Sequence, residues 1–209
     1  LGLAGQKQKE GTPTMGGVII ILATVVPSLL FADLSNVYVV LILLATVWMA
    51  VIGFVDDYIK VFRKNKKGLH GAFKVLGQVG LGLIIALTMI VNDDIVVRME
   101  VTAAEAIGLT ADDRTGEVIE VRMDDGSLVA KADYKTNLTN VPFLKGNHLD
   151  YAWLLPLREQ LARRWVWIIF VPLVIFIVTA VSNGANLTDG LAGLATGVSG
   201  IVAVALGLF

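Results

Sequence analysis

Long apolar runs alternate with short polar stretches along most of this chain. Apolar residues dominate residues 15–31, 37–55, 75–91 and 165–181, and another apolar run begins at residue 194. A helix needs about 20 predominantly apolar residues to cross a bilayer, so the pattern predicts four spanning helices and the start of a fifth.

The polar segment between residues 92 and 164 interrupts this pattern and has the period of a strand. Residues 118–123 alternate between apolar and charged side chains, and the alternation resumes over residues 128–134. The Asp125-Gly126 pair between the two stretches is a typical hairpin turn, so we predict a β-hairpin here.

The chain is therefore expected to have three parts. Residues 1–91 form transmembrane helices with loops that carry motifs, residues 92–164 form a small extracytoplasmic insertion that contains the hairpin, and residues 165–209 return to the membrane. Composition supports this fold class, an α-helical integral membrane protein, because 56% of the residues are hydrophobic, against roughly 45–50% in soluble domains. The absence of cysteine excludes disulfides and thiolate metal sites. A net charge of −1 gives no reason to expect a nucleic-acid partner.

The distribution of Lys and Arg predicts the orientation. Residues 56–74 contain six basic residues, whereas the turn at residues 33–36 contains none, so residues 56–74 are expected in the cytoplasm. Counting crossings from there places residues 1–14 and 182–193 on the same side and residues 92–164 outside. The three polar stretches with candidate chemistry would then share one face of the membrane.

The first candidate site is an acid pair at the end of the second apolar run. Asp56 and Asp57 follow that run directly, and Lys60 with four further cations follows within ten residues. Adjacent carboxylates beside several cations suit a divalent metal and a phosphorylated ligand. The alternative is that the two acids merely end a membrane helix in water, and the pair alone does not decide between these interpretations.

Two other polar motifs allow similar alternatives. Residues 9–17 contain glycines, Lys9 and Thr14, which could contact a phosphate; alternatively Thr12 and Pro13 simply start a helix. Residues 183–194 contain two Asn, a Thr, an Asp and several glycines. They could form a turn that presents amides and a carboxylate to a nucleotide or metal, or a loop of small residues that pack helices together.

Together, the motifs at residues 11–17, 56–60 and 186–195 resemble those of the phospho-N-acetylmuramoyl-pentapeptide transferases, bacterial membrane enzymes that make lipid I. The resemblance implies ten transmembrane helices, of which about five are present here, in a Mg²⁺-dependent, usually homodimeric protein of the bacterial plasma (inner) membrane. It also implies transfer of phospho-MurNAc-pentapeptide from UDP-MurNAc-pentapeptide to undecaprenyl phosphate, with release of UMP.

The resemblance also assigns roles to individual residues. Asp56 would act as general base or position the lipid phosphate, and Asp57 would lie in the metal environment. The candidate catalytic residues are Asp56, Asp57 and Asp189; the candidate substrate-binding residues are Lys9, Thr14, Lys60, Asn186, Gly190 and Leu191; the candidate metal ligands are Asp56 and Asp57.

Two alternatives remain open at this point. One is a sibling transferase that uses another UDP-sugar, and the other is a non-catalytic membrane protein, either a truncated remnant or a transport component. The absence of Asp, Glu, Lys and Arg from residues 75–91 and 165–181 argues against transport, because transporters carry polar groups at mid-membrane.

The sequence departs from the family pattern in two places. Ala192 stands where the family has Asp, and the later Gly-Asp-x-Gly-Ser stretch of the family is not reached by residue 209. Loss of one charge-assisted hydrogen bond, about 1.5–3 kcal/mol, would weaken nucleotide binding roughly tenfold to a hundredfold. We therefore expect a complete active site to need sequence beyond residue 209.

Overall fold

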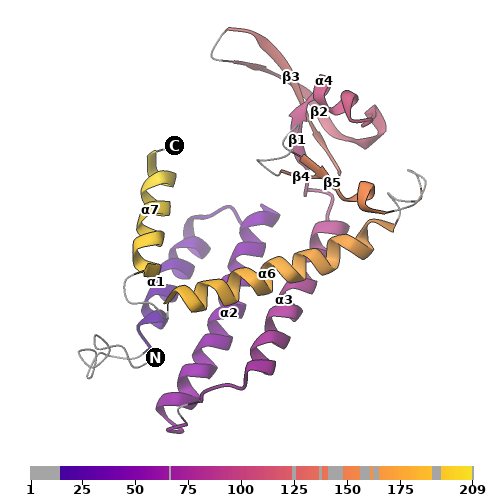
Figure 1. The fold of residues 1–209 in the computed structure, drawn as a ribbon. Helices are drawn as coiled ribbons and strands as arrows, with labels where there is room; N and C mark the ends of the chain where they lie inside the picture. The colour runs from indigo at the N-terminus through magenta and orange to yellow at the C-terminus, as the bar shows by residue number, and fades with distance from the viewer. Residues whose placement is uncertain are drawn as a thin grey trace. The chain divides into compact units, whose positions relative to one another are not determined.

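The computed structural model describes residues 15–65, 67–123, 126–136, 138–140, 148–155, 161, 165–189 and 194–208. The chain divides into two compact units (Figure 1). The helical unit comprises residues 1–82 and 176–209, and the β unit comprises residues 83–175. Two long helices, α3 and α6, contribute residues to both units.

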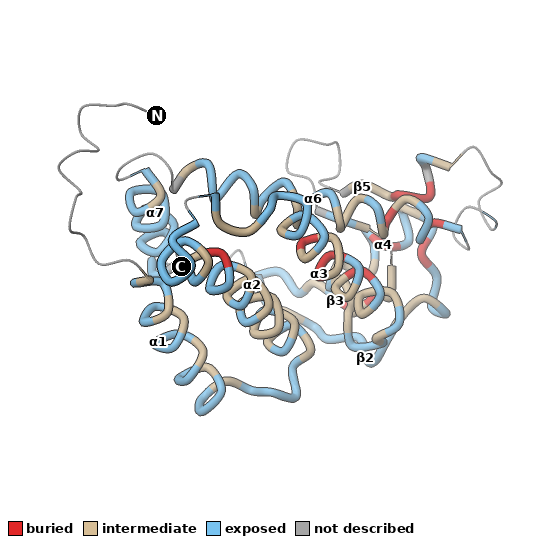
Figure 2. Tube along the Cα trace, turned by 90° about the horizontal axis from the view of Figure 1, so that it is seen from below, coloured by how far each residue is buried: buried red, intermediate tan, exposed pale blue. Residues whose placement is uncertain are grey.

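Five apolar helices confirm the predicted membrane fold. They are α1 (Gly16–Phe31), α2 (Val37–Val61), α3 (Gly71–Val91), α6 (Trp167–Asp189) and α7 (Leu194–Leu208). Of these, α2, α3 and α6 are long and apolar enough to cross a bilayer, and α1 and α7 are shorter apolar helices. Most residues of α1, α2 and α7 are exposed or half-buried (Figure 2), as expected for side chains that face lipid.

Two of these helices extend past the predicted ends of the apolar runs. The second apolar run ends at residue 55, but α2 continues to Val61, and α6 continues to Asp189 through residues predicted to form a turn. Polar side chains end a hydrophobic run without ending a helix when they bond within it. In α6 the hydroxyl of Thr188 donates to the carbonyl of Gly184 at 2.8 Å, which satisfies both groups inside the helix.

The starts of α2 and α3 are fixed by caps that were not predicted from the sequence. The side chain of Asn36 accepts a hydrogen bond from the amide of Tyr38 at 2.9 Å at the start of α2, and His70 accepts one from the amide of Ala72 at 3.3 Å at the start of α3. The N-cap of α1 is Met15, with φ of 73°. The proposed cap residues Thr12 and Pro13 lie outside the described residues.

The β unit contains the predicted hairpin. Strands β2 (Arg114–Arg122) and β3 (Leu128–Tyr134) pair antiparallel, with β1 (Val97–Glu100) on the other edge of β3. Gly126, with φ of 84°, lies in the turn and donates its amide to the carbonyl of Met123 at 2.9 Å. A second ladder joins β4 (Leu138–Asn140) to β5 (His148–Asp150), and a short helix, α4 (Val101–Ala106), follows β1.

One apolar core cluster of the β unit lies at one end of the hairpin. Ala132 and Tyr134 near the end of β3 are each 1% exposed and pack with Ala104 and Leu109. By contrast, Ile119, on the face expected to be apolar, is 49% exposed. A register irregularity between Thr115 and Ile119 separates the packed end of the hairpin from the exposed end.

Candidate functional site

The two adjacent acids lie in the last turns of α2 and have different environments. The side chains of consecutive residues in a helix point about 100° apart, so Asp56 and Asp57 face different surroundings. The side chain of Asp56 is 11% exposed, whereas that of Asp57 is 47% exposed. The acid pair therefore provides one enclosed and one open carboxylate.

The carboxylate of Asp56 is bonded on both oxygens. Its Oδ2 lies 2.6 Å from Nζ of Lys60 and 2.9 Å from Nζ of Lys74, and its Oδ1 accepts a hydrogen bond of 2.7 Å from the amide of Leu69. We call these four groups the Asp56 cluster. Lys60 is four residues along α2, a spacing that brings the two side chains together and also favours continuation of the helix past the apolar run.

The loop between α2 and α3 folds back onto Asp56 because Gly68 allows it. Gly68 has φ of 65°, and a Cβ at this position would collide with Oδ1 of Asp56 and lie 2.6 Å from Cε of Lys60. The amide of Gly68 donates to the carbonyl of Asn65 at 2.9 Å, which closes the turn before Leu69. A left-handed backbone and a close approach thus both require glycine here.

Asp57 faces a different part of the helical unit. It lies at a groove of about 410 Å³ between α1 and α2. The other lining residues are Met15, Gly17, Val18, Ile21, Thr46, Met49, Ala50, Gly53 and Phe54. Met15 and Gly17 belong to the first polar motif, so the structure places the described end of that motif beside Asp57. Nζ of Lys60, 3.9 Å from Oδ1 of Asp57, connects the groove to the Asp56 cluster.

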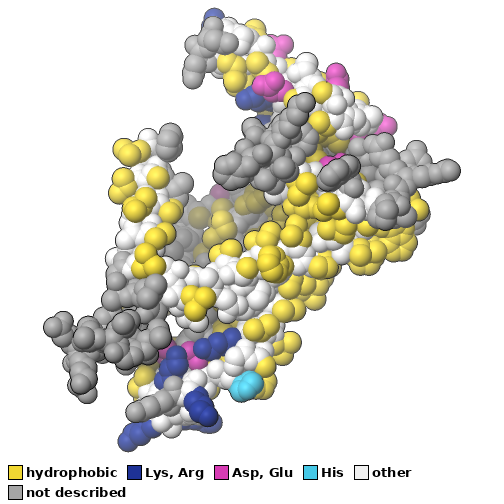
Figure 3. Space-filling model, in the orientation of Figure 1, with side chains coloured by type: hydrophobic (Ala, Val, Ile, Leu, Met, Phe, Trp, Pro, Cys, Tyr) yellow, Lys and Arg dark blue, Asp and Glu magenta, His cyan; other side chains and the backbone are white. Residues whose placement is uncertain are grey.

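Basic side chains surround the acid pair. Figure 3 shows Lys and Arg side chains gathered at the end of the helical unit that carries the loop between α2 and α3. The described members are Lys60, Arg63, Lys64, Lys67 and Lys74. Their combined positive potential favours a phosphorylated ligand at this end of the helices.

The third motif is described only in part. Asn186 is exposed near the end of α6 and Asp189 is its last residue. Within the described residues the structure gives no hydrogen bond between Asn186 and either acid of the pair. Lys9, Thr14, Gly190, Leu191 and Ala192 lie outside the described residues.

Of the two acids, Asp57 has the carboxylate that is open to a metal ion. Mg²⁺ usually takes one or two carboxylates and fills its other positions with water and substrate phosphates. The half-exposed Asp57 fits that requirement, whereas both oxygens of Asp56 already accept bonds. The part of the chain that the structure describes has no group of three or more His, Asp or Glu that could hold a metal.

Three contributors to this end of the molecule were not predicted from the sequence. Lys74 and the amide of Leu69 complete the Asp56 cluster, and Gln78 bonds α3 to α6. Gln78 had a signal in the sequence, because it is the only strongly polar side chain in the run of residues 75–91. Nothing in the sequence indicates that the Leu69 amide turns towards Asp56.

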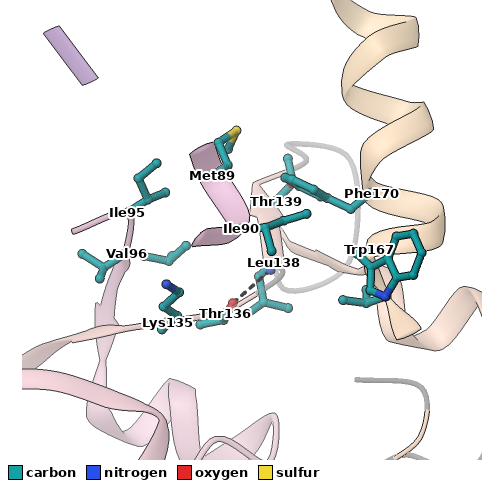
Figure 4. A pocket seen from close by; sticks show the side chains of 12 residues that line it. Met89, Ile90, Ile95, Val96, Lys135, Thr136, Leu138, Thr139, Trp167 and Phe170 are labelled. Carbon is teal, nitrogen blue, oxygen red and sulfur yellow. Dashed lines mark hydrogen bonds between the residues drawn. The ribbon is translucent and has the colours of Figure 1, made fainter. Parts of the chain in front are cut away.

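A second cavity, of about 280 Å³, lies within the β unit (Figure 4). Two of its polar side chains, Lys135 and Thr136, are bonded inside the protein. Nζ of Lys135 lies 2.6 Å from a carboxylate oxygen of Asp93, and the hydroxyl of Thr136 accepts a hydrogen bond of 2.9 Å from the amide of Leu138. These bonds join β4 and the preceding loop to the end of α3, so the cavity has a structural explanation.

Comparisons with known proteins agree with the site. The family model for phospho-N-acetylmuramoyl-pentapeptide-transferase signature 1 matches residues 9–21, and that for glycosyl transferase family 4 matches residues 130–209. The transferase of Flavobacterium johnsoniae that carries the first of these names is 51% identical over 209 residues, all of this chain and 48% of the relative. The corresponding proteins of Flavobacterium psychrophilum and Parabacteroides distasonis are each 49% identical over the whole of this chain. The match covers 48% of the first protein and 46% of the second.

The chain thus spans about half the length of the curated relatives it matches. No solved structure matches it. The aligned region covers all of the chain, so it spans the acid pair, the basic loop and the insertion as well as the motif at residues 9–21. This chain belongs to the phospho-N-acetylmuramoyl-pentapeptide transferase family.

Proposed function

We propose that this chain is part of an enzyme that transfers phospho-MurNAc-pentapeptide from UDP-MurNAc-pentapeptide to undecaprenyl phosphate, giving lipid I and UMP. The observation that carries this proposal is the acid pair of α2, with Asp57 open to a groove and Asp56 holding two lysines. The match of signature 1 to residues 9–21 favours this donor over another UDP-sugar.

The proposed reaction forms one phosphorus–oxygen bond and breaks another. An oxygen of the lipid phosphate attacks the phosphorus next to the sugar, and the bond to UMP breaks. Such transfers need positioning and charge neutralisation more than covalent chemistry by the protein. Asp56 would contribute by holding the ammonium groups of Lys60 and Lys74 in place beforehand, so that little reorganisation is needed when charge develops.

In this proposal, Asp57 would hold Mg²⁺ at the open side of the acid pair. The metal would neutralise charge on the diphosphate, and Lys60, close to both acids, would contact the same phosphates. The hypotheses that Asp56 is also a metal ligand or a general base remain predictions. Either role requires Asp56 to exchange Lys60, Lys74 or the Leu69 amide for the new partner.

The nucleotide would be held by the other two motifs. Asn186, Asp189, Gly190 and Leu191 would bind the uridine, and Lys9 and Thr14 would line the nucleotide side of the site. Support comes from the position of Asn186 at the end of α6, in the same unit as the acid pair. Asp189 would serve as a catalytic residue from the last position of that helix.

The setting that we propose is the bacterial plasma membrane, with the basic loop in the cytoplasm, the β unit outside and two copies forming a homodimer. The lack of cysteine makes the orientation testable. A cysteine at Ser127 should react with an impermeant reagent on intact cells, and one at Asn65 should not. Equal labelling at the two positions would contradict the orientation.

The activity is best tested on the chain extended to the length of its relatives, in vesicles that contain undecaprenyl phosphate. We expect release of UMP from UDP-MurNAc-pentapeptide, loss of release when EDTA removes the metal, and little release from UDP-N-acetylglucosamine. Preference for UDP-N-acetylglucosamine would favour a sibling transferase. Release that does not depend on the lipid phosphate would contradict the proposed acceptor.

A further inference from the structure

Gln78 is one of two buried polar or charged side chains in the described part of the chain, the other being Asp56. It is 5% exposed and lies in α3, and the proposed reaction does not use it. A primary amide in such a place needs partners for both its NH₂ and its oxygen. Both partners come from α6.

The amide of Gln78 joins the two helices in both directions. Its Nε2 donates to the hydroxyl of Ser182 at 2.9 Å, and its Oε1 accepts from Nδ2 of Asn183 at 3.0 Å. Nδ2 of Asn183 also donates to the carbonyl of Thr179 at 2.8 Å, which fixes that side chain on α6. We call the three residues Gln78, Ser182 and Asn183 the amide bridge.

On α6 the bridge lies along the face that leads to the third motif. Asn186 follows Ser182 by four residues and Asn183 by three, so all three share a face of the helix. Asp189 follows Ser182 by seven residues, close to two full turns, which places its backbone position on the same face. Any rotation of α6 about its axis would move these positions together.

On α3 the bridge lies one turn from the Asp56 cluster. Lys74, whose Nζ is 2.9 Å from Asp56, precedes Gln78 by four residues and shares its face. The preceding residue, Gly77, accepts a hydrogen bond of 2.9 Å from the indole of Trp48 in α2, and a Cβ on Gly77 would lie 2.5 Å from Cδ1 of Ile52. Residues 77 and 78 therefore attach α3 to α2 and to α6 at one level.

We propose that Gln78 is a positioning residue that sets the rotation of α6 against α3, and thereby places Asn186 and Asp189 relative to Asp56 and Lys74. The consequence for nucleotide binding rests on the proposed function, whereas the effect on α6 does not. Because apolar side chains slide against each other and against lipid with little preference, a directional bond between two amides is what distinguishes one helix rotation from another.

The test compares Gln78→Leu with a matched control in the same helix, in the chain extended to the length of its relatives. Thr88→Val is the control, because the hydrogen bond that the described structure gives the Thr88 hydroxyl lies within its own helix, to the carbonyl of Ile84 at 2.9 Å. The conservative pair is Gln78→Asn with Asn183→Gln, which moves one methylene from α3 to α6. Each of these two single variants should disturb the bridge, and the double variant should restore it.

Two readouts are needed. Hydrogen–deuterium exchange of the amides of residues 182–189 in detergent reports on α6 without any substrate, and should be faster in Gln78→Leu than in Thr88→Val. Steady-state kinetics report on the site. Because a rotation of α6 would move the uridine-binding Asn186 and the catalytic Asp189 together, KM for UDP-MurNAc-pentapeptide should rise about tenfold and kcat should fall as well.

Equal exchange in Gln78→Leu and Thr88→Val would overturn the proposal. So would a KM that matches the control, or a double variant that restores neither exchange nor KM, because a purely structural role gives no such rescue. If the parent protein releases no UMP from any UDP-sugar, the proposed function fails and the exchange comparison alone decides the role of Gln78.

Discussion

The helical unit and the β unit are stabilised by opposite kinds of burial. In the helical unit the large apolar side chains are mostly exposed, and the buried residues include the polar Asp56 and Gln78. In the β unit the buried cluster around Ala132 and Tyr134 is apolar, and the ion pair of Arg98 and Asp133 lies at the surface.

The difference follows from the solvent that each unit is built for. In lipid, no hydrophobic effect drives apolar helices together. Directional hydrogen bonds between helices therefore determine their relative positions and rotations. Water drives apolar side chains of a sheet together whatever the exact polar contacts. In the helical unit, therefore, changes to polar groups should alter function, and in the β unit, changes to apolar groups should alter stability.

The largest effect is expected from Asp57→Asn, which removes the open carboxylate and keeps its size. Release of UMP by the extended protein should fall by at least about a hundredfold, as for other electrostatic contacts to a reacting phosphate. The melting temperature in detergent should change little, because a half-exposed side chain contributes little stability. Asp33→Asn, at the exposed turn between α1 and α2, is the control and should retain activity.

Full activity of Asp57→Asn would remove this residue from the metal site. A large loss in Asp33→Asn as well would mean that charge alone, and not position beside the groove, accounts for the effect. Both variants should be assayed at several Mg²⁺ concentrations, since a weakened metal site is partly restored by excess metal.

The next effect concerns the core of the β unit. Tyr134 is 1% exposed, so Tyr134→Ala should lower the free energy of unfolding of this unit by about 3–5 kcal/mol. The hydroxyl of Tyr134 is buried with no hydrogen-bond partner in the described structure, so Tyr134→Phe should be neutral or stabilising. Hydrogen–deuterium exchange of β1 to β3 measures both, and UMP release should change less than about threefold.

A loss of activity in Tyr134→Ala as large as the loss of β structure would show that the two units depend on each other. The polar burial of one unit and the apolar burial of the other would then be local differences within a single cooperative folding unit. Tyr134→Phe removes only the hydroxyl, so it tests whether the hydroxyl itself contributes to any loss seen in Tyr134→Ala.

A smaller effect is expected at Gly68, where the loop approaches Asp56. Gly68→Ala costs about 1–2 kcal/mol for the left-handed backbone, and its methyl also displaces the Asp56 carboxylate. Gly126→Ala is a matched control, since Gly126 also has positive φ but nothing lies within 4 Å of its added Cβ. Both should lose stability through the left-handed backbone, Gly68→Ala should lose more because of the collision with Asp56, and only Gly68→Ala should lower kcat. Equal kinetics would separate the Asp56 cluster from catalysis.

The fold was largely predictable from the sequence because solvent imposes periodicity. Continuous apolar runs predicted the membrane helices, and alternation over residues 118–134 predicted the hairpin of β2 and β3. The helix ends were not predictable in the same way. The extension of α6 to Asp189 depends on polar groups that bond inside the helix or to Gln78, and composition cannot distinguish these from a solvated turn.

The site was predictable in kind but not in geometry. The sequence identified Asp56 and Asp57 as a pair, and periodicity places them on different sides of a helix. Which of them is enclosed depends on Gly68 and Lys74, through a loop that closes by backbone bonds invisible in a residue pattern. The partners of Gln78 lie 104 and 105 residues away, so only the tertiary structure relates them.

The smallest effect is expected from pH, at the ion pair on the surface of the β unit. The Arg98 guanidinium donates two hydrogen bonds to Asp133, from Nε to Oδ1 at 2.7 Å and from Nη2 to Oδ2 at 2.8 Å. These hydrogen bonds hold the pKa of Asp133 below its usual value. A carboxyl group whose pKa is lower in the folded state stabilises the fold fully above its unfolded pKa, about 3.9, and loses that contribution as pH falls through the folded pKa.

Asp133→Asn should therefore lower the melting temperature at neutral pH by about 2–4 °C, a small change because the pair is partly exposed to water. The difference from the parent protein should shrink as the pH falls below the unfolded value of about 3.9, and should vanish below the folded pKa of Asp133. Glu120→Gln, an exposed residue of β2 that has no ion pair in the described structure, is the control and should show neither effect. Melting curves from pH 7 down to the lowest pH at which the parent protein still folds decide the matter. A difference between Asp133→Asn and the parent that persists unchanged at low pH would mean that Asp133 stabilises the sheet by hydrogen bonding alone, and that surface charge contributes nothing to the β unit.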